Sequence, residues 1–413
     1  MADLDRGGIA RCRLCGAALR ASLIDLGATP LANALVTPAE EARGADPTFP
    51  LHVRVCAACL LVQVEETVPP DAIFADYPYF ASVSSSWVLH ARDCAAAMTD
   101  RFALDTRTTV LEIASNDGYL LRHFAARGMT VLGIEPAANV AAAARARGIA
   151  TEVAFFSLAL ARRMTVRAGL IVACNVLAHV PDMVDFVRGI ALLLAPDGVA
   201  LFEFPHLLRL LEGVQFDTIY HEHYAYLSLL VVERVLSKAG LRVFDVEELP
   251  THGGSLRVLA CHHAARHEAE ARLHAVRAAE RAARLDTLAG YAGFAARAAT
   301  VQQRLRQYLA AQRQAGRRIA AYGAAAKGAT LLNSSGITAA DIAFIADRAP
   351  AKQGRRMPGC RIPIVPPAAL FAAPPDDVLI LPWNLAAEIA DELAPLRQAG
   401  TRLWVAVPAL RML

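Results

Sequence analysis

The chain has 413 residues, of which 55% are hydrophobic and 20% are charged. This composition excludes a disordered or fibrous protein, and the length predicts two or three folded units. The 42 Lys and Arg residues nearly balance the 39 Asp and Glu residues, and the net charge of +3 favours neither nucleic acid nor an anionic membrane as a partner.

The amino-terminal residues do not have the pattern of a targeting segment. Met1 to Arg6 include two acidic residues, and no apolar run in the chain reaches the roughly 18 residues of a membrane span. We therefore expect a soluble, cytoplasmic protein that binds neither nucleic acid nor membrane. Cytoplasmic thiols stay reduced, so closely paired cysteines indicate a metal rather than disulfides.

Residues 1–70 contain two Cys-x-x-Cys pairs, formed by Cys12, Cys15, Cys56 and Cys59. Two such turns supply the four soft ligands that Zn²⁺ prefers in a tetrahedral site. A redox pair would explain one Cys-x-x-Cys motif but not two. We predict a closed, structural zinc site, and we expect the residues between the pairs to contain strands of their own.

Residues 71–262 show an alternation of strand-like and helical stretches. The strand-like runs cover 109–113, 130–134, 170–174, 199–204 and 257–261. This alternation is typical of a mostly parallel sheet with helices on its faces. The fold class is therefore α/β.

The first of these strands leads into a polar loop and then into a helix over 119–127. Glu135 follows the loop at the end of the next strand, where a carboxylate can accept hydrogen bonds from two ribose hydroxyls. A dinucleotide needs a Gly-rich turn, whereas this loop has acidic side chains and the single glycine Gly118. The loop therefore favours S-adenosylmethionine (SAM), whose sulfonium and ammonium are cationic, over NAD. An acidic loop without a ligand is the remaining alternative.

A second cluster, Tyr220-His-Glu-His-Tyr224, concentrates imidazole, carboxyl and phenol groups. An imidazole polarised by a carboxylate is a general base near neutral pH, and a turn here would let Glu222 and His223 converge on one ligand. A structural hydrogen-bonded cluster, or metal binding by His221 and His223, remains open.

Two further polar residues follow the strand at 170–174. Asn175 and His179 are four residues apart, a spacing that on a helix places both side chains on one face. They would then lie at the carboxyl edge of the sheet, where ligands of α/β proteins bind.

Residues 263–315 contain no proline and predict one or two long helices that connect to a second α/β unit over 316–413. In that unit, Tyr322-Gly-Ala-Ala-Ala-Lys-Gly328 follows a strand and opens a helix. The small residues permit a close approach of the backbone, and a helix amino terminus together with Lys327 favours a phosphate. Tight packing of strand on helix is the alternative explanation.

Taken together, these motifs resemble the C-methyltransferases that act on nucleotide-linked 4-keto-deoxy sugars. The similarity runs nearly from end to end, and its strings are the two cysteine pairs, Asp76-Tyr-Pro-Tyr-Phe-Ala-Ser82, Glu112-Ile-Ala-Ser-Asn-Asp-Gly118, Tyr220-His-Glu-His223, His252-Gly-Gly-Ser-Leu-Arg257 and Ala321-Tyr-Gly-Ala-Ala-Ala-Lys-Gly328. The resemblance implies a zinc-binding module (1–70), a Rossmann-like SAM-binding domain (71–262), a helical connector (263–315) and a carboxy-terminal domain (316–413) that helps to hold the nucleotide-sugar.

The resemblance also implies roles for individual residues. A base, His223, would remove the proton at C3 beside the 4-keto group, and the resulting enediolate would attack the methyl group of SAM. The remaining catalytic candidates are Tyr220, Glu222 and His179, together with Tyr77 or Tyr79 from a lid. The cofactor-binding candidates are Glu112, Ala114, Asn116, Asp117, Gly118, Glu135, Asn139 and Asn175. The substrate-binding candidates are His252, Gly253, Ser255, Arg257, Tyr322 and Lys327.

Two other classes of function compete with this one. A NAD-dependent nucleotide-sugar oxidoreductase would use the two α/β units as cofactor and substrate domains. A non-catalytic, zinc-bearing interaction protein would need neither His223 nor SAM. The nucleotide, the sugar and the oligomeric state are not specified by the motifs.

Overall fold

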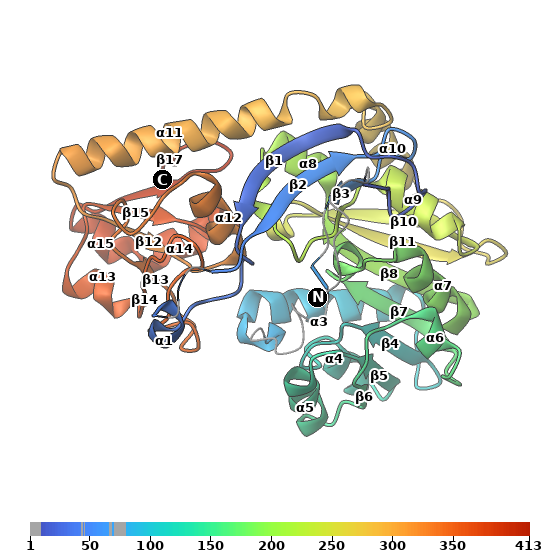
Figure 1. Ribbon diagram of the computed structural model, residues 1–413. Coiled ribbons are helices and arrows are strands. Elements are labelled where there is room, and N and C mark those ends of the chain that lie inside the picture. The colour runs from blue at the N-terminus through green and yellow to red at the C-terminus, as the bar shows by residue number, and fades with distance from the viewer. Residues whose placement is uncertain (1–9, 43, 45, 66–67, 70–79) are drawn as a thin grey trace.

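The computed structural model describes residues 10–42, 44, 46–65, 68–69 and 80–413. Within these residues the chain forms three sheets, and a long helix, α11, crosses from the central region to the carboxy-terminal unit (Figure 1). The predicted lid residues Tyr77 and Tyr79 lie outside the described residues.

The first sheet has four antiparallel strands in the order β1-β2-β3-β9. Their bounds are Ala21–Thr29, Phe49–Val55, Val62–Val64 and Ala225–Tyr226. Strands β1 and β2 lie between the two cysteine pairs, which confirms that this interval carries strands. The short helix α1 (Pro38–Glu41) lies in the connection from β1 to β2, and Thr37 caps its amino terminus. Strand β9 comes from a distant part of the chain, so the first sheet is completed by the segment that follows His223.

The central sheet has seven strands in the order β10-β11-β8-β7-β4-β5-β6. In chain order, β4 to β8 are Thr109–Ile113, Thr130–Ile134, Thr151–Glu152, Ala168–Cys174 and Leu194–Pro205, and β10 and β11 are Leu241–Leu249 and Ser255–His262. Strands β4 to β8 run parallel, whereas β10 and β11 are antiparallel to their neighbours. The predicted mostly parallel sheet is confirmed, and β10 extends it beyond the predicted strands.

Helices cover both faces of the central sheet. They are α3 (Ser85–Arg101), α4 (Leu121–Ala125), α5 (Ala138–Ala146), α6 (Leu158–Ala161), α7 (Met183–Leu193) and α9 (Leu229–Ser237). A further helix, α8 (Leu207–Glu212), packs with the apolar residues of the first sheet. Alternate residues of β4 point to opposite faces: Leu111 packs with α7 and α9, and Val110 packs with α3 and α4. This alternation is the expected result of the two-residue period of a strand.

The connector contains α10 (Ala271–Ala282) and α11 (Phe294–Gln314), which confirms the predicted helices. The third sheet follows with the order β14-β13-β12-β15-β16-β17, in which only β17 is antiparallel. Its strands β12 to β17 are Ile319–Tyr322, Ile345–Ala346, Ile364–Val365, Asp377–Ile380, Arg402–Val405 and Arg411–Met412, and its helices α12 to α15 are Ala326–Ser334, Ala368–Ala372, Ala386–Glu392 and Ala394–Gln398. None of the helices in the described ranges is long and apolar enough to cross a membrane.

Candidate active site

A cavity of about 670 Å³ opens at the carboxyl ends of β4, β5 and β7. Its walls come from all three sheet-containing parts of the molecule. Asn33 belongs to the connection between β1 and β2, His179 and His223 belong to the central region, and Lys327 and Lys352 belong to the carboxy-terminal unit. The cavity therefore lies where an α/β sheet binds its ligands, and neighbouring units form part of its wall.

The loop after β4 has an unusual backbone. Ala114, Asn116 and Gly118 have positive φ angles of 56°, 48° and 78°. A Cβ atom on Gly118 would lie 2.9 Å from Ile149, so a larger residue does not fit there. The tight turn brings the amide of Asn116 to Glu135, whose Oε2 accepts its hydrogen at 3.0 Å, while Oε1 accepts from the amide of Ala137 at 2.9 Å. Burial raises the pKa of Glu135.

The eight predicted cofactor-binding residues divide into two groups. Ala114, Asn116, Glu135 and Asn175 line the cavity, whereas Glu112, Asp117, Gly118 and Asn139 do not. Glu112 is buried, and this burial raises its pKa well above the ordinary value. Asp117 is paired with Arg147 at 2.7 Å. The acidic character expected of the loop is therefore reduced, and Glu135 is the carboxyl group of this region that faces the cavity.

The segment that carries His223 is a turn, the conformation that would let Glu222 and His223 converge on one ligand. The Nδ1 of His223 donates to the carbonyl oxygen of Thr218 at 2.9 Å, which leaves Nε2 as the basic nitrogen of the neutral ring. Burial, and then the neighbouring His179, hold the pKa of His223 well below its usual value. The expected partner Glu222 does not orient this imidazole, because Nδ1 donates to the backbone carbonyl of Thr218 instead.

The imidazole of His179 lies beside that of His223 and is also held by a backbone carbonyl. Its Nδ1 donates to the backbone carbonyl of Glu222 at 2.7 Å, its ring centroid lies 4.8 Å from that of His223, and burial lowers its pKa. The helix expected through Asn175 and His179 is absent. Asn175 instead has a left-handed φ of 51°, and Leu177–His179 form a single 3-10 turn. Both side chains nevertheless line the cavity.

Tyr220 and Glu222 complete the cluster around the imidazoles. The ring of Tyr220 lies 4.1 Å from that of His223, centroid to centroid. Burial raises the pKa of Glu222 to about 7, so a neutral carboxyl group is populated at physiological pH. His221 points elsewhere, since its Nε2 donates to the carbonyl oxygens of Phe49 and Pro50 at 3.1 Å.

Only two of the six predicted substrate-binding residues line the cavity. His252 and Lys327 line the cavity. Arg257 is instead buried in ion pairs with Glu203 and Glu247, at 3.0 and 2.9 Å. The other members lie outside the cavity lining: the hydroxyl of Ser255 donates to Thr251, that of Tyr322 donates to Glu392, and Gly253 lies against Trp383. These three residues are thus engaged by neighbouring protein groups outside the cavity.

The cavity also includes residues that the sequence motifs did not reveal. They are Asn33, Trp87, Thr218, Lys352 and the neighbouring Phe155 and Phe156, among others. Trp87 lies in the first turn of α3, its ring stacks on His90 with centroids 4.8 Å apart, and it lies 5.3 Å from the ring of His252. For Trp87, its position in the first turn of a helix that follows the predicted lid residues could have indicated a place in the cavity wall.

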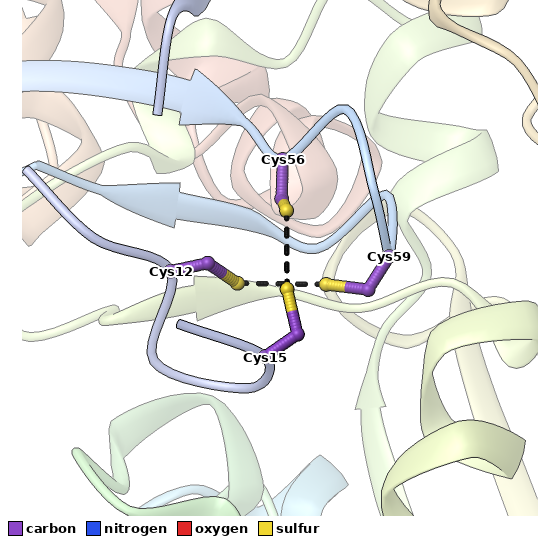
Figure 2. A group of neighbouring side chains, drawn as sticks. All are labelled: Cys12, Cys15, Cys56 and Cys59. Carbon is purple, nitrogen blue, oxygen red and sulfur yellow. Dashed lines mark hydrogen bonds between the residues drawn. The ribbon is translucent and has the colours of Figure 1, made fainter. Parts of the chain in front are cut away.

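The four cysteines form a compact group. Cys12 and Cys59 have Sγ atoms 3.4 Å apart, Cys15 and Cys56 have theirs 3.5 Å apart, and all four sulfurs lie within 4.8 Å of one another. Figure 2 shows the four side chains pointing toward one centre from two tight turns. Zn–S bonds of about 2.3 Å require sulfur–sulfur distances of roughly 3.8 Å in a tetrahedron. The group therefore fits Zn²⁺, and Gln63 Nε2 donates to Cys12 Sγ at 3.2 Å.

Comparisons with known proteins agree with this arrangement. Three family models match in succession: "Putative zinc binding domain" over residues 12–74, "Methyltransferase domain" over 88–246 and "C-methyltransferase C-terminal domain" over 250–408. The C-methyltransferase NovU of Streptomyces niveus is 36% identical over 408 residues, which cover 98% of this chain and 97% of that protein. The chain belongs to the C-methyltransferase family.

Solved structures add weaker similarities. A SAM-dependent methyltransferase from Clostridium acetobutylicum has a TM-score of 0.35 and 13% identity, over 41% of this chain and 90% of that one. Magnesium protoporphyrin IX methyltransferase from Synechocystis PCC 6803 with bound SAM has a TM-score of 0.34 and 13% identity, over 42% and 79% of the two chains. Similarities of this size do not establish a relationship, and the family assignment rests on the sequence matches.

Membership of this family makes the enzyme a SAM-dependent C-methyltransferase with a zinc-binding amino-terminal module. The NAD-dependent and the non-catalytic alternatives are therefore set aside. The cavity fits the cofactor. Ala114 and Asn116, which have left-handed φ angles, line it together with Glu135. The lysines of the cavity wall, Lys327 and Lys352, belong to the carboxy-terminal unit. A carboxyl group such as Glu135 suits the two ribose hydroxyls of SAM, and its negative charge would repel a pyrophosphate.

Proposed function

We propose that this C-methyltransferase transfers the methyl group of SAM to C3 of a nucleotide-linked 4-keto-deoxy sugar. The observation that carries the proposal is the pair of imidazoles, His179 and His223, in one cavity with the loop at Asn116 and with Lys327. A base, a cofactor loop and a cationic wall are what such a reaction needs in one place.

The base in this proposal is His223. A base must be neutral to accept a proton, and burial favours the neutral imidazole of His223 because it penalises the charged form. The hydrogen bond from Nδ1 to Thr218 fixes the ring, so Nε2 is the nitrogen that takes the proton from the sugar carbon. His179, held through its own Nδ1, lies beside it and orients the substrate.

Deprotonation beside a ketone needs stabilisation of the enolate oxygen, since the proton is otherwise far too weakly acidic for an imidazole. Glu222 in its neutral form and the phenol of Tyr220 are the donors that we assign to this oxygen. Both line the cavity with His223. SAM, when bound, supplies the electrophilic methyl group that the enediolate carbon attacks.

The diphosphate of the nucleotide is assigned to the wall built by the carboxy-terminal unit. Lys327 stands in the first turn of α12, where its Nζ donates to Asn384 at 2.6 Å, and Lys352 donates to the carbonyl oxygen of Ala324 just before that helix at 2.8 Å. Two ammonium groups beside a helix amino terminus favour a phosphate. Burial lowers the pKa of Lys327, while Asp217 opposes this effect.

The test is turnover of a small panel of nucleotide-linked 4-keto sugars by the purified enzyme with SAM. The 4-keto group acidifies both of its neighbours, C3 and C5, so the product must be analysed by NMR to locate the new methyl group. We expect methylation at C3 of at least one member. SAM should raise the melting temperature and NAD should not. Absence of any methylated sugar, with SAM bound, would contradict the proposal.

A further inference from the structure

The connection between β1 and β2 places one polar side chain in the wall of the active-site cavity. The Nδ2 of Asn33 donates to Oε1 of Glu222 at 2.6 Å, although the two residues are 189 positions apart. Asn33 belongs to neither Cys-x-x-Cys pair and lies in none of the motifs of the central region. Through this hydrogen bond, the amino-terminal part that carries the four cysteines contacts the side chain of Glu222.

The segment around Asn33 is also bonded to the carboxy-terminal unit, through Arg356. The amide of Val36 donates to the carbonyl of Arg356 at 3.0 Å, and the amide of Arg356 donates back to Val36 at 2.8 Å. The guanidinium of Arg356 also pairs with Glu41 at 2.6 Å. The connection is thus fixed between the first sheet and the carboxy-terminal unit, and Asn33 is presented to Glu222 from a supported backbone.

We propose that Asn33 is a positioning residue for methyl transfer, whose amide holds the Glu222 carboxyl group with Oε1 as the acceptor and Oε2 as the oxygen that carries the proton. This inference rests on the proposed role of Glu222 as a donor to the enolate oxygen. The other groups around this carboxyl group are His179, His223 and Tyr224. Asn33 donates directly to the carboxyl group itself, at 2.6 Å, and this hydrogen bond sets its orientation.

The hydrogen bond has a consequence for titration. Burial raises the pKa of Glu222 to about 7, and donation by Asn33 opposes this rise because it stabilises the charged carboxylate. Removing the donor in Asn33→Ala raises the pKa further. Asn33→Asp raises it more, because two neighbouring carboxyl groups cannot both ionise and come to share a proton.

The experiment measures kcat against pH for the full-length, zinc-loaded enzyme and for N33A and N33D. We expect the alkaline limb of the profile to move up by about one pH unit in N33A, and further in N33D, while kcat at its optimum falls. Thr37→Ala, which removes a cap on the same connection but no cavity contact, is the matched control and should leave the limb unmoved. Zinc content and melting temperature are measured for every variant.

A substrate-independent readout separates this inference from the proposed function. Carbon-13 NMR of Glu-labelled enzyme reports the titration of Glu222, with E222Q identifying its signal. A raised midpoint in N33A and N33D supports the inference even if no nucleotide sugar is methylated, an outcome that would sink only the proposed function. An unmoved midpoint, or a uniform loss of kcat with an unchanged pH profile, overturns it.

Discussion

At the scale of single residues, the account depends on which imidazole accepts the proton. His223→Asn removes the basic nitrogen while keeping a donor for the Thr218 carbonyl, and we expect kcat to fall by roughly two to four decades. SAM binding, measured by calorimetry, should persist because the loop at Asn116 is untouched. The matched control is His221→Gln in the same turn. His221 faces β2 rather than the cavity, so the control should change the melting temperature more than kcat.

The pH dependence follows from the directions of two pKa shifts. The pKa of His223 lies well below its usual value, so the base is competent from mildly acidic pH upward. The pKa of Glu222 is about 7, and its protonated form is the donor, so kcat should fall above about pH 7. In Glu222→Gln the amide still donates but no longer titrates. We therefore expect a lower kcat without the alkaline limb, and a limb that survives in this variant would exclude Glu222 as its origin.

Sequence spacing was enough to place candidates near one another where their surroundings are local. Asn116 in the loop after β4 and His223 in its turn both line the cavity. Sequence spacing failed where long-range contacts decide the direction of a side chain. Arg257 was a candidate for substrate binding, but its partners Glu203 and Glu247 lie on neighbouring strands, and sequence spacing does not reveal such pairs.

At the scale of elements, the four cysteines link the turn before β1 to the turn after β2. They sit on two turns that flank β1 and β2, and Cys56 is fully buried. Cys56→Ser should therefore lower the zinc content from one ion per chain and reduce the melting temperature by roughly 10 °C. Cys94→Ala removes a buried thiol of α3 outside the group and is the control. Unchanged stability after zinc loss in Cys56→Ser would show that the metal is not structural.

Strands were easier to predict than their partners. The runs 109–113 and 130–134 coincide with β4 and β5, because buried parallel strands are short, apolar and bounded by polar turns. The pairing of β9 with β3 had no local signal, since β9 has two residues and its partner is more than 150 positions away. The connection that carries Asn33 was missed for the same reason: it is a loop whose importance depends on what packs against it.

At the scale of the whole molecule, the cavity exists only because three units meet. Lys327 reaches it from the carboxy-terminal unit, which Trp383 attaches to the central region by donating to Asp217 at 2.7 Å. Lys327→Met should raise KM for the nucleotide sugar about 10- to 100-fold with a smaller effect on kcat, because the lost charge binds a phosphate that does not react. Lys238→Met, at the exposed end of α9, is the control. A loss confined to kcat would contradict the phosphate assignment.

The most direct test of the central claim follows the sugar proton itself. The enzyme is mixed with a nucleotide-linked 4-keto sugar in D2O without SAM, and deuterium at the carbons beside the keto group is measured by NMR. We predict that the native enzyme catalyses exchange at C3, that His223→Asn does not, and that adding SAM replaces deuterium by a methyl group at the same carbon. Exchange at an undiminished rate in His223→Asn would contradict the account.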